Sequence, residues 1–142
     1  MFDNILVVCI GNICRSPTAE RLLRLHYPQK MISSAGIAAL EGQPADSTAS
    51  LVAAAHGVLL DGHIARQLTH QLCQDADLIL VMEKEHISAV HHIAPCVRGK
   101  ILLFGHWLAQ HEITDAYGMS KDAHEYIYQS LARAADSWVG KL

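Results

Sequence analysis

Four short apolar runs, separated by segments of helical periodicity, constrain what this chain can fold into. The runs cover residues 5–9, 31–35, 78–82 and 100–104. They show little alternation between apolar and polar residues. That pattern is typical of strands covered on both faces, and helical crossovers between parallel strands supply the cover. The sequence therefore predicts an α/β fold with three layers, α/β/α, around a four-stranded parallel sheet.

Helical periodicity and capping signals predict five helices between and after these strands. They are expected at residues 17–25, 47–56, 69–75, 84–92 and 120–139. Asp46 suits the N-cap of the second helix, and Gly57 follows directly after its end, where glycine is favoured. In the last helix apolar residues recur at helical spacing, so we expect Trp138 in the core, without a functional role.

Length and composition favour a single domain over residues 1–142, long enough for one good core and too short for two ordinary domains. Apolar residues make up 51% and charged residues 18%, so disorder is not expected. The net charge of −3 gives no footprint for nucleic-acid binding. The start of the chain lacks the positive region of a signal peptide, no apolar run suits a membrane span, and the four cysteines are irregularly spaced. We therefore expect a cytoplasmic protein with reduced thiols.

The first apolar run leads into a short loop with the features of an anion-binding site. Cys9 ends the run, and Arg15 follows after the five residues Ile10, Gly11, Asn12, Ile13 and Cys14. At the start of a helix, backbone N–H groups and the helix dipole favour a bound anion, and Gly11 allows close approach. The same field favours the thiolate form of Cys9, which is the nucleophile. Arg15 can hold two phosphoryl oxygens with its planar fork.

A buried structural cysteine is the simpler interpretation of Cys9 alone, because cysteine is often buried. The complete string favours the phosphate site, since Gly11, Arg15, Ser16 and Pro17 each meet a separate requirement of an anion loop that enters a helix. Ser16 can cap that helix or donate its hydroxyl to the Cys9 sulfur. Pro17 suits the first helical position.

The chain resembles the low-molecular-weight protein tyrosine phosphatases, whose C-x5-R-S loop lies near the N-terminus, as it does here. The resemblance continues to the final helix through residues 33–36 (SSAG), 63–67 (HIARQ) and 115–117 (DAY). Within the family the sequence is most similar to the bacterial branch that serves exopolysaccharide or capsule production. The resemblance implies hydrolysis of phosphotyrosine through a phosphocysteine on Cys9, with Arg15 as phosphate ligand and without a cofactor or metal.

The resemblance also implies a general acid, which the family carries in an Asp-Pro-Tyr loop. Asp115 matches this position, but Ala116 stands where the family usually has proline. Proline biases the residue before it towards extended backbone. Its absence should leave Asp115 freer and the loop more mobile. If Asp115 is dispensable, Glu112 and Asp122 are the nearest substitutes.

Supporting roles are carried over from the family to matching positions. A hydrogen-bond network that holds the phosphate loop is implied for Asn12, Ser16, Ser34 and His63. Cys14 matches a second loop cysteine that can trap oxidised Cys9 as a disulfide, so we expect reversible inactivation by peroxide.

Leu40 and Tyr117 are expected to wall the substrate cleft, although a buried loop anchor is an equally open alternative for Leu40. A deep wall favours phosphotyrosine over the shorter phosphoserine. The implied partner is a phosphotyrosine protein, namely an autophosphorylating bacterial tyrosine kinase with a tyrosine-rich tail, and we expect a monomer. The ten histidines form no metal-binding motif, and the pairs His86/His91 and His106/His111 are expected on the surface.

Two other functions stay open. A thiol-dependent arsenate reductase shares this fold and loop but needs further, closely spaced cysteines, whereas Cys73 and Cys96 lie 23 residues apart. A non-catalytic phosphotyrosine-binding module would result if the Ala116 loop no longer delivered an acid. A phosphoryl carrier fits less well, because a long-lived phosphocysteine would not have an acid and base nearby.

Overall fold

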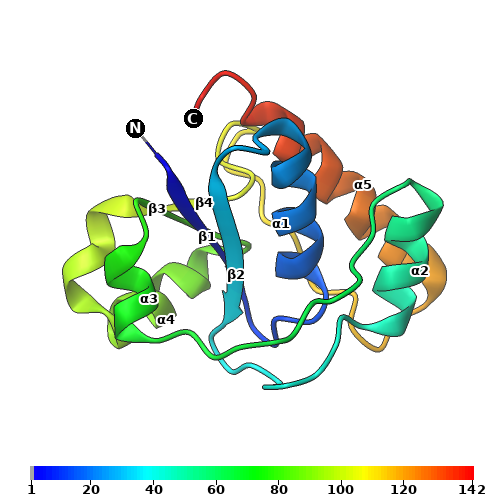
Figure 1. Cartoon of the computed structure of the whole chain (residues 1–142), viewed down its shortest axis with the longest axis horizontal. Coiled ribbons are helices and arrows are strands. Elements are labelled where there is room, and N and C mark those ends of the chain that lie inside the picture. Colours follow the sequence, from blue (N-terminus) through cyan, green and yellow to red (C-terminus); the bar gives the residue numbers. More distant parts are fainter. Residues whose placement is uncertain (1) are drawn as a thin grey trace.

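A parallel four-stranded sheet with the strand order β2-β1-β3-β4 forms the centre of the molecule (Figure 1). The computed structural model describes residues 2–142, except for the side chain of Arg98. Met1, the first residue of the expected domain, lies outside the described residues. The strands are β1 Asn4–Cys9, β2 Met31–Gly36, β3 Leu78–Val81 and β4 Ile101–Leu103. The predicted fold class is confirmed.

Helices cover both faces of the sheet. The helices α1, α2 and α5 lie on one side, and α3 and α4 lie on the other (Figure 1). Their bounds are α1 Arg15–His26, α2 Ser47–Ala55, α3 His70–Asp75, α4 Lys84–Ile93 and α5 Lys121–Ser137, and the 3₁₀ helix η1 Pro95–Lys100 precedes β4. All five predicted helices are present. None of the helices in the described part of the chain has the length and hydrophobicity needed to cross a membrane.

The central strand β1 is buried on both faces. Ile5 and Val7 pack into the apolar cluster with α1 and α5, whereas Leu6 and Val8 pack into the cluster with α3 and α4. This explains why the run lacks polar alternation. In the strand order β2-β1-β3-β4, the chain passes from β1 to the neighbour on one side, β2, and from β3 to the neighbour on the opposite side, β4. The strand order therefore reverses between β1 and β3. The loop after β1 therefore lies where open α/β sheets bind ligands.

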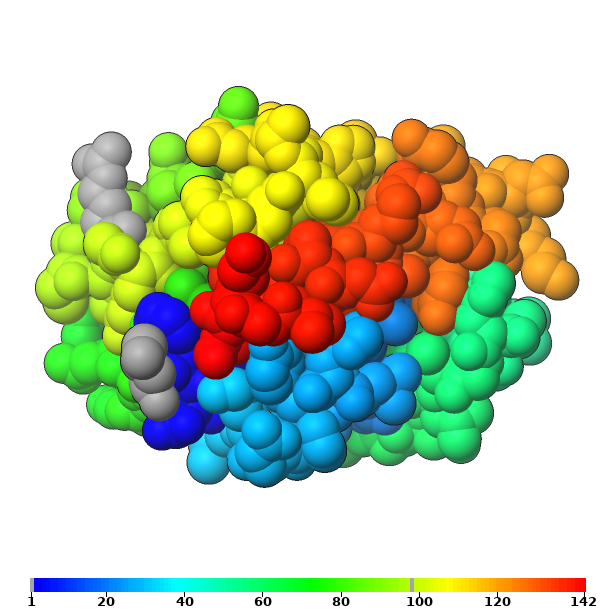
Figure 2. All heavy atoms as spheres, turned by 90° about the horizontal axis from the view of Figure 1, so that it is seen from above, coloured from blue at the N-terminus to red at the C-terminus, as the bar shows by residue number. Residues whose placement is uncertain are grey.

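The C-terminal helix closes the face that carries α1. Figure 2 shows the end of α5 (red) lying between α1 (blue) and the segment after β4 (yellow). Trp138, the C-cap of α5, is buried and donates its indole N–H to the carbonyl of Phe104 at 2.7 Å. Its predicted place in the core is confirmed.

The start of α1 differs from the prediction. The helix begins at Arg15, its N-cap is Cys14 without a side-chain cap, and Pro17 is the third helical residue. The predictions that Ser16 caps this helix and that Pro17 opens it are therefore wrong. The reason is that the Ser16 hydroxyl is engaged inside the phosphate loop instead.

Helix α2 agrees with its predicted capping signals. The Asp46 side chain accepts a hydrogen bond from the N–H of Ala49 at 3.0 Å, and Gly57 follows the helix with a φ of 82°. The backbone N–H of Asp46 also donates to the carbonyl of Ile13 at 2.8 Å. This cap therefore ties the start of α2 to the phosphate loop.

Candidate active site

The loop between β1 and α1 surrounds the sulfur of Cys9. Cys9 is the last residue of β1 and is 3% exposed. The backbone N–H of Asn12 donates to Cys9 Sγ at 3.3 Å, and Ser16 Oγ lies 2.9 Å from the same sulfur. Because Ser16 Oγ accepts a hydrogen bond from the Asn12 amide at 2.8 Å, its own proton is available to the sulfur. The sulfur can thus accept two hydrogen bonds inside the loop.

Asn12 holds the loop from within. It is buried and has the left-handed φ of 60°, a conformation that asparagine tolerates better than most residues. Its amide also donates to Ser34 Oγ at 3.0 Å and accepts from the N–H of Arg66 at 2.9 Å. His63 Nε2 lies 2.6 Å from the Asn12 carbonyl, so that nitrogen carries the proton and donates. The four residues expected to support the loop are thus brought together.

A buried carboxylate that the sequence reasoning missed continues this network. Ser34 Oγ donates to Glu20 Oε1 at 2.8 Å. The other oxygen of Glu20 pairs with Arg21 at 3.0 Å and Arg24 at 3.3 Å, which compensates the burial of its charge. The available signal was the place of Glu20 one helical turn after Ser16, on the inner face of the predicted helix.

The edge strand β2 passes close to the phosphate loop at Gly36. A Cβ at this position would lie 2.5 Å from the carbonyl oxygen of Ile10, so this approach requires glycine. Beyond it, the N–H groups of Ile37 and Ala38 donate to the carbonyls of Cys9 and Ile10, both at 2.9 Å. The loop is therefore held from β2 as well as from its own helix.

Arg15 is buried, and one edge of its guanidinium has no hydrogen-bond partner among the described residues. Nη1 donates to Glu83 Oε2 at 2.6 Å and to the carbonyl of Ile113 at 2.7 Å. Nε and Nη2, which share the opposite edge, have no hydrogen-bond partner among the described residues. Buried donors are rarely left unsatisfied. Two such donors side by side match a bidentate oxyanion.

Glu83 and Ile113 were not foreseen as site residues. Glu83 lies two residues after β3 and is the N-cap of α4. It therefore lies at the carboxyl end of the parallel strands, where the phosphate loop also lies. That position was a usable signal for Glu83. Ile113 acts through its backbone carbonyl, which every residue has, so its residue type could not predict this contact.

His86 corrects a further expectation, because it is 3% exposed and not on the surface. It completes a capping box at the start of α4, in which its Nδ1 accepts from the backbone N–H of Glu83 at 3.3 Å. Burial in this turn lowers the pKa of His86, and the nearby Arg15 guanidinium lowers it further. Periodicity alone did not reveal that this face of α4 turns inwards.

The segment that carries Asp115 forms the opposite wall of the cleft. Asp115 Oδ1 accepts from the backbone N–H of Tyr117 at 3.0 Å, and Oδ2 lies 3.9 Å from Arg15 Nη2. The Asp115 side chain is 41% exposed, whereas Ala116 is buried. Neither Glu112 nor Asp122 lines the cleft in the described part of the chain. Asp115 is therefore the carboxyl group placed for proton transfer there.

The cleft has a volume of about 190 Å³. Leu40 and Tyr117 both line it and are 44% and 55% exposed. Leu40 is thus a wall of the cleft and not a buried anchor. The lining comprises Cys9, Ile10, Gly11, Ile13, Cys14, Ala38, Leu40, Asp115 and Tyr117. Apolar side chains thus line the cleft together with the phosphate loop and one carboxylate.

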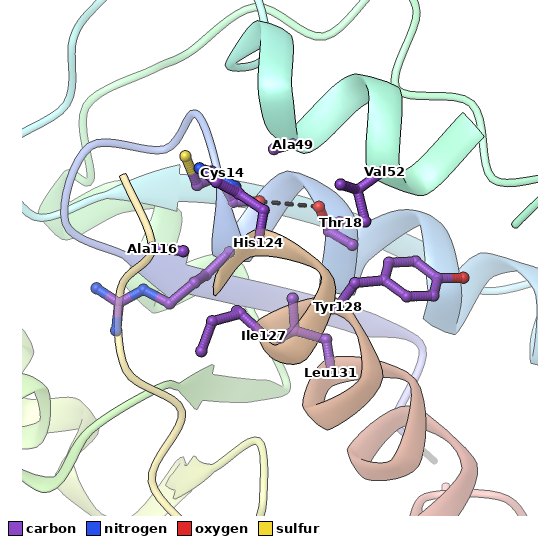
Figure 3. A pocket seen from close by; sticks show the side chains of 10 residues that line it. Cys14, Thr18, Ala49, Val52, Ala116, His124, Ile127, Tyr128 and Leu131 are labelled. Carbon is purple, nitrogen blue, oxygen red and sulfur yellow. Dashed lines mark hydrogen bonds between the residues drawn. The ribbon is translucent and has the colours of Figure 1, made fainter. Parts of the chain in front are cut away.

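Cys14 lies at the boundary between this cleft and a small cavity behind the loop. The cavity, of about 20 Å³, is lined by residues of α1, α2, α5 and the acid segment, as we call residues 113–117, among them Ala116, His124 and Ile127 (Figure 3). Burial raises the pKa of the Cys14 thiol, and the carboxylates of Asp46 and Asp115 raise it further. Cys14 is therefore a protonated thiol beside the reactive one.

One group of described residues has the spacing of a metal site, namely Glu83, Glu85 and His86, whose ligand atoms lie within 4.8 Å of one another. The Glu83 carboxylate, however, already binds Arg15 at 2.6 Å. The guanidinium charge would repel a cation at this point, so the arrangement fits a clamp on Arg15 better than a metal centre.

Comparison with known proteins places the chain among phosphatases. The family model described as low molecular weight phosphotyrosine protein phosphatase matches residues 4–142. The chain is 58% identical over its whole length to the probable low molecular weight protein-tyrosine-phosphatase AmsI of Erwinia amylovora, covering 99% of that protein. It is 53% identical to the Wzb phosphatase of Salmonella typhimurium, covering all of this chain and 95% of that protein.

A solved structure agrees with these sequence matches. The structure of Vibrio vulnificus Wzb in complex with benzylphosphonate superposes with a TM-score of 0.98 at 51% identity, covering 100% of both chains. The overall fold and the sequence thus agree with those of these relatives. The chain belongs to the low molecular weight phosphotyrosine protein phosphatase family.

Proposed function

We propose that this protein hydrolyses phosphotyrosine on proteins through a phosphocysteine intermediate on Cys9. The observation that carries the proposal is the unpartnered edge of the buried Arg15 guanidinium beside the Cys9 loop, with the Asp115 carboxyl 3.9 Å from Nη2. Cys9 and Asp115 line the same cleft, and Arg15 is buried beside it, 3.9 Å from Asp115. We assign them the roles of nucleophile, proton donor and oxyanion ligand. Each performs a step that cleavage of a phosphate monoester requires.

In the first step the Cys9 thiolate attacks phosphorus in line with the tyrosine oxygen. Nε and Nη2 of Arg15, together with the loop N–H groups, hold the equatorial oxygens while charge shifts among them. Asp115 gives its proton to the departing oxygen as the P–O bond breaks. This leaves tyrosine and a phosphorylated Cys9.

In the second step water cleaves the phosphocysteine. Asp115, now ionised, takes a proton from the attacking water, the P–S bond breaks, and Cys9 returns to the thiolate as orthophosphate leaves. Arg15 and the start of α1 supply the positive field in both steps. We expect neither step to need a metal or cofactor.

The walls of the cleft support an aromatic substrate. Leu40 and Tyr117 stand above the phosphate loop, and an aryl ring between them reaches the loop where a serine side chain is too short. The benzylphosphonate bound by the Vibrio vulnificus relative has the same aryl-and-phosphoryl character. The substrate we propose is an autophosphorylated bacterial tyrosine kinase of exopolysaccharide or capsule production, met in the cytoplasm by a monomeric phosphatase.

The direct test is hydrolysis of a phosphotyrosine peptide in the presence of EDTA. We expect turnover by the wild type, none by Cys9→Ser, and a loss of about 10²–10⁴-fold in Asp115→Asn. Asp122→Asn, which changes an exposed carboxylate outside the cleft lining, is the matched control and should retain full activity. The same samples are assayed for arsenate reduction coupled to thioredoxin.

Each other outcome points to a different function. Tight binding of the peptide without turnover by the wild type would indicate a phosphotyrosine-binding module. Arsenate reduction would indicate a reductase, although the buried Cys73 and the exposed Cys96 do not line the cleft. An Asp115→Asn variant as active as the wild type would remove Asp115 from the mechanism.

A further inference from the structure

The side chain of His86 is buried next to the phosphate site, and the reaction described above does not use it. Its Nε2 has no hydrogen-bond partner among the described residues. Glu83 Oε2, the oxygen that binds Arg15 Nη1 at 2.6 Å, lies 3.6 Å from His86 Nε2. A buried polar atom without a partner calls for an explanation.

The tautomer of His86 follows from its other nitrogen. Nδ1 accepts the backbone N–H of Glu83 at 3.3 Å, so Nδ1 carries no proton, and the proton of the neutral ring is on Nε2. That N–H faces the Glu83 carboxylate. The ring therefore contacts Glu83 twice, at its backbone through Nδ1 and at its side chain through Nε2.

We propose that His86 is a positioning residue that holds the Glu83 carboxylate against Arg15 and thereby aims the free edge of the guanidinium at the phosphoryl group. This rests on the proposed function, in which Arg15 binds the transferred phosphoryl. Arg15 is buried, and among the described residues its Nη1 donates to Glu83 and to the carbonyl of Ile113. A shift of Glu83 therefore removes one of these two supports.

The charges around His86 favour the neutral ring that this arrangement needs. Arg15 faces it from α1, Glu83 and Glu85 from the start of its own helix, and Glu112 from the segment before Asp115. Burial and Arg15 lower its pKa, and the three carboxylates oppose this without reversing it. Protonation would break the Nδ1 contact to the Glu83 backbone and place a second cation beside Arg15.

Two conservative variants separate positioning from a plain helix cap. In His86→Asn the amide oxygen can take the place of Nδ1, which keeps the cap but removes the N–H beside the Glu83 carboxylate. In His86→Gln the amide nitrogen can take the place of Nε2, which keeps an N–H beside the carboxylate but loses the cap. His92→Asn, at an exposed position of the same helix, is the control.

The readout is the Kd for orthophosphate, measured by calorimetry, together with kcat/KM for a phosphotyrosine peptide. We expect His86→Asn to raise the Kd and lower kcat/KM by about fivefold or more, whereas His86→Gln retains most of the phosphate affinity even if its Tm falls. The opposite order, with His86→Asn like the wild type and His86→Gln impaired, would reduce His86 to a cap and overturn the proposal.

A double-mutant cycle with Glu83→Gln provides an independent check. If His86 acts through the Glu83 carboxylate, His86→Asn should change the phosphate Kd much less in the Glu83→Gln background than in the wild type. Equal effects in both backgrounds would contradict the proposal. Because the Kd does not depend on turnover, a protein that binds phosphate without hydrolysing peptide would refute the proposed function and leave this test intact.

Discussion

The phosphate loop and the acid segment face each other across the cleft, but the protein holds them in different ways. Within the loop, Asn12 and Ser16 are buried and make side-chain hydrogen bonds to one another and to β2. Asp115, on the opposite wall, is 41% exposed; its carboxylate accepts one backbone N–H, from Tyr117, and lies 3.9 Å from Arg15 Nη2. The phosphate loop is thus preorganised by several buried hydrogen bonds, whereas the Asp115 side chain has few contacts.

This difference has a physical reason. Oxyanion binding gains most from donors that need no reorganisation, and burial in a saturated network provides that. A general acid must give up a proton, take another and let the product leave, which a partly exposed loop allows. We therefore expect substitutions in the phosphate loop to cost more activity than substitutions beside Asp115.

Arg15→Lys should give the largest loss. Lysine keeps the charge but lacks the two parallel donors of the free edge, so kcat/KM should fall by about 10²–10³-fold, with a parallel loss of orthophosphate affinity. Steady-state kinetics and calorimetry measure both. Arg133→Lys, at an exposed position on α5, should change neither. A loss below about tenfold in Arg15→Lys would show that charge alone suffices and that the loop is less preorganised than its geometry indicates.

Two substitutions at Asn12 separate the effect of its backbone conformation from the effect of its side-chain hydrogen bonds. Asn12→Gly keeps the left-handed conformation and loses the amide, whereas Asn12→Ala loses the amide and also strains the backbone. Both should lose about 10²-fold in kcat, because the loop shifts around Cys9. Alanine should be less stable than glycine by about 1–2 kcal/mol in the free energy of unfolding. If both variants keep wild-type turnover, the network does not position the loop.

Cys14→Ser should alter the response to peroxide and leave turnover nearly unchanged. In the wild type, oxidised Cys9 (sulfenic acid) condenses with the protonated Cys14 thiol to a disulfide and releases water, and dithiothreitol restores activity. Without Cys14 the sulfenic acid is open to irreversible oxidation. The measurement is the fraction of activity recovered after a peroxide pulse. Equal recovery in both proteins would exclude Cys14 as the resolving thiol.

Ala116→Pro should have the smallest effect, on the wall that carries Asp115. The backbone N–H of Ala116 donates no hydrogen bond among the described residues, and the side chain borders the small cavity behind the loop, so a proline ring has space there. Turnover should be maintained or raised, and the free energy of unfolding should rise by about 0.4–1 kcal/mol. A large loss of kcat in a folded variant would show that the acid segment has a geometry that proline cannot adopt.

The strands and helices were predictable because their signals are local. A central parallel strand such as β1 is apolar throughout, and the cap at Asp46 and the glycine at position 57 mark the ends of α2 within a few residues. The start of α1 was predicted at the wrong residue because the hydroxyl of Ser16, a residue type that often caps helices, contacts the Cys9 sulfur instead. The capping preference of serine therefore did not predict the start of this helix, because the Ser16 hydroxyl is hydrogen-bonded inside the phosphate loop.

The sequence by itself determined the architecture and, with the family resemblance, singled out Cys9 and Asp115, which line the cleft, and the buried Arg15. Tertiary structure alone decided how Arg15 is held. Its partners Glu83 and Ile113 lie 68 and 98 residues away along the chain, and the second acts through a carbonyl that every residue type possesses. Which guanidinium edge stays free thus depends on how β3, α4 and the acid segment pack around α1. Contacts at such separations depend on the global packing and leave no periodic trace in the sequence.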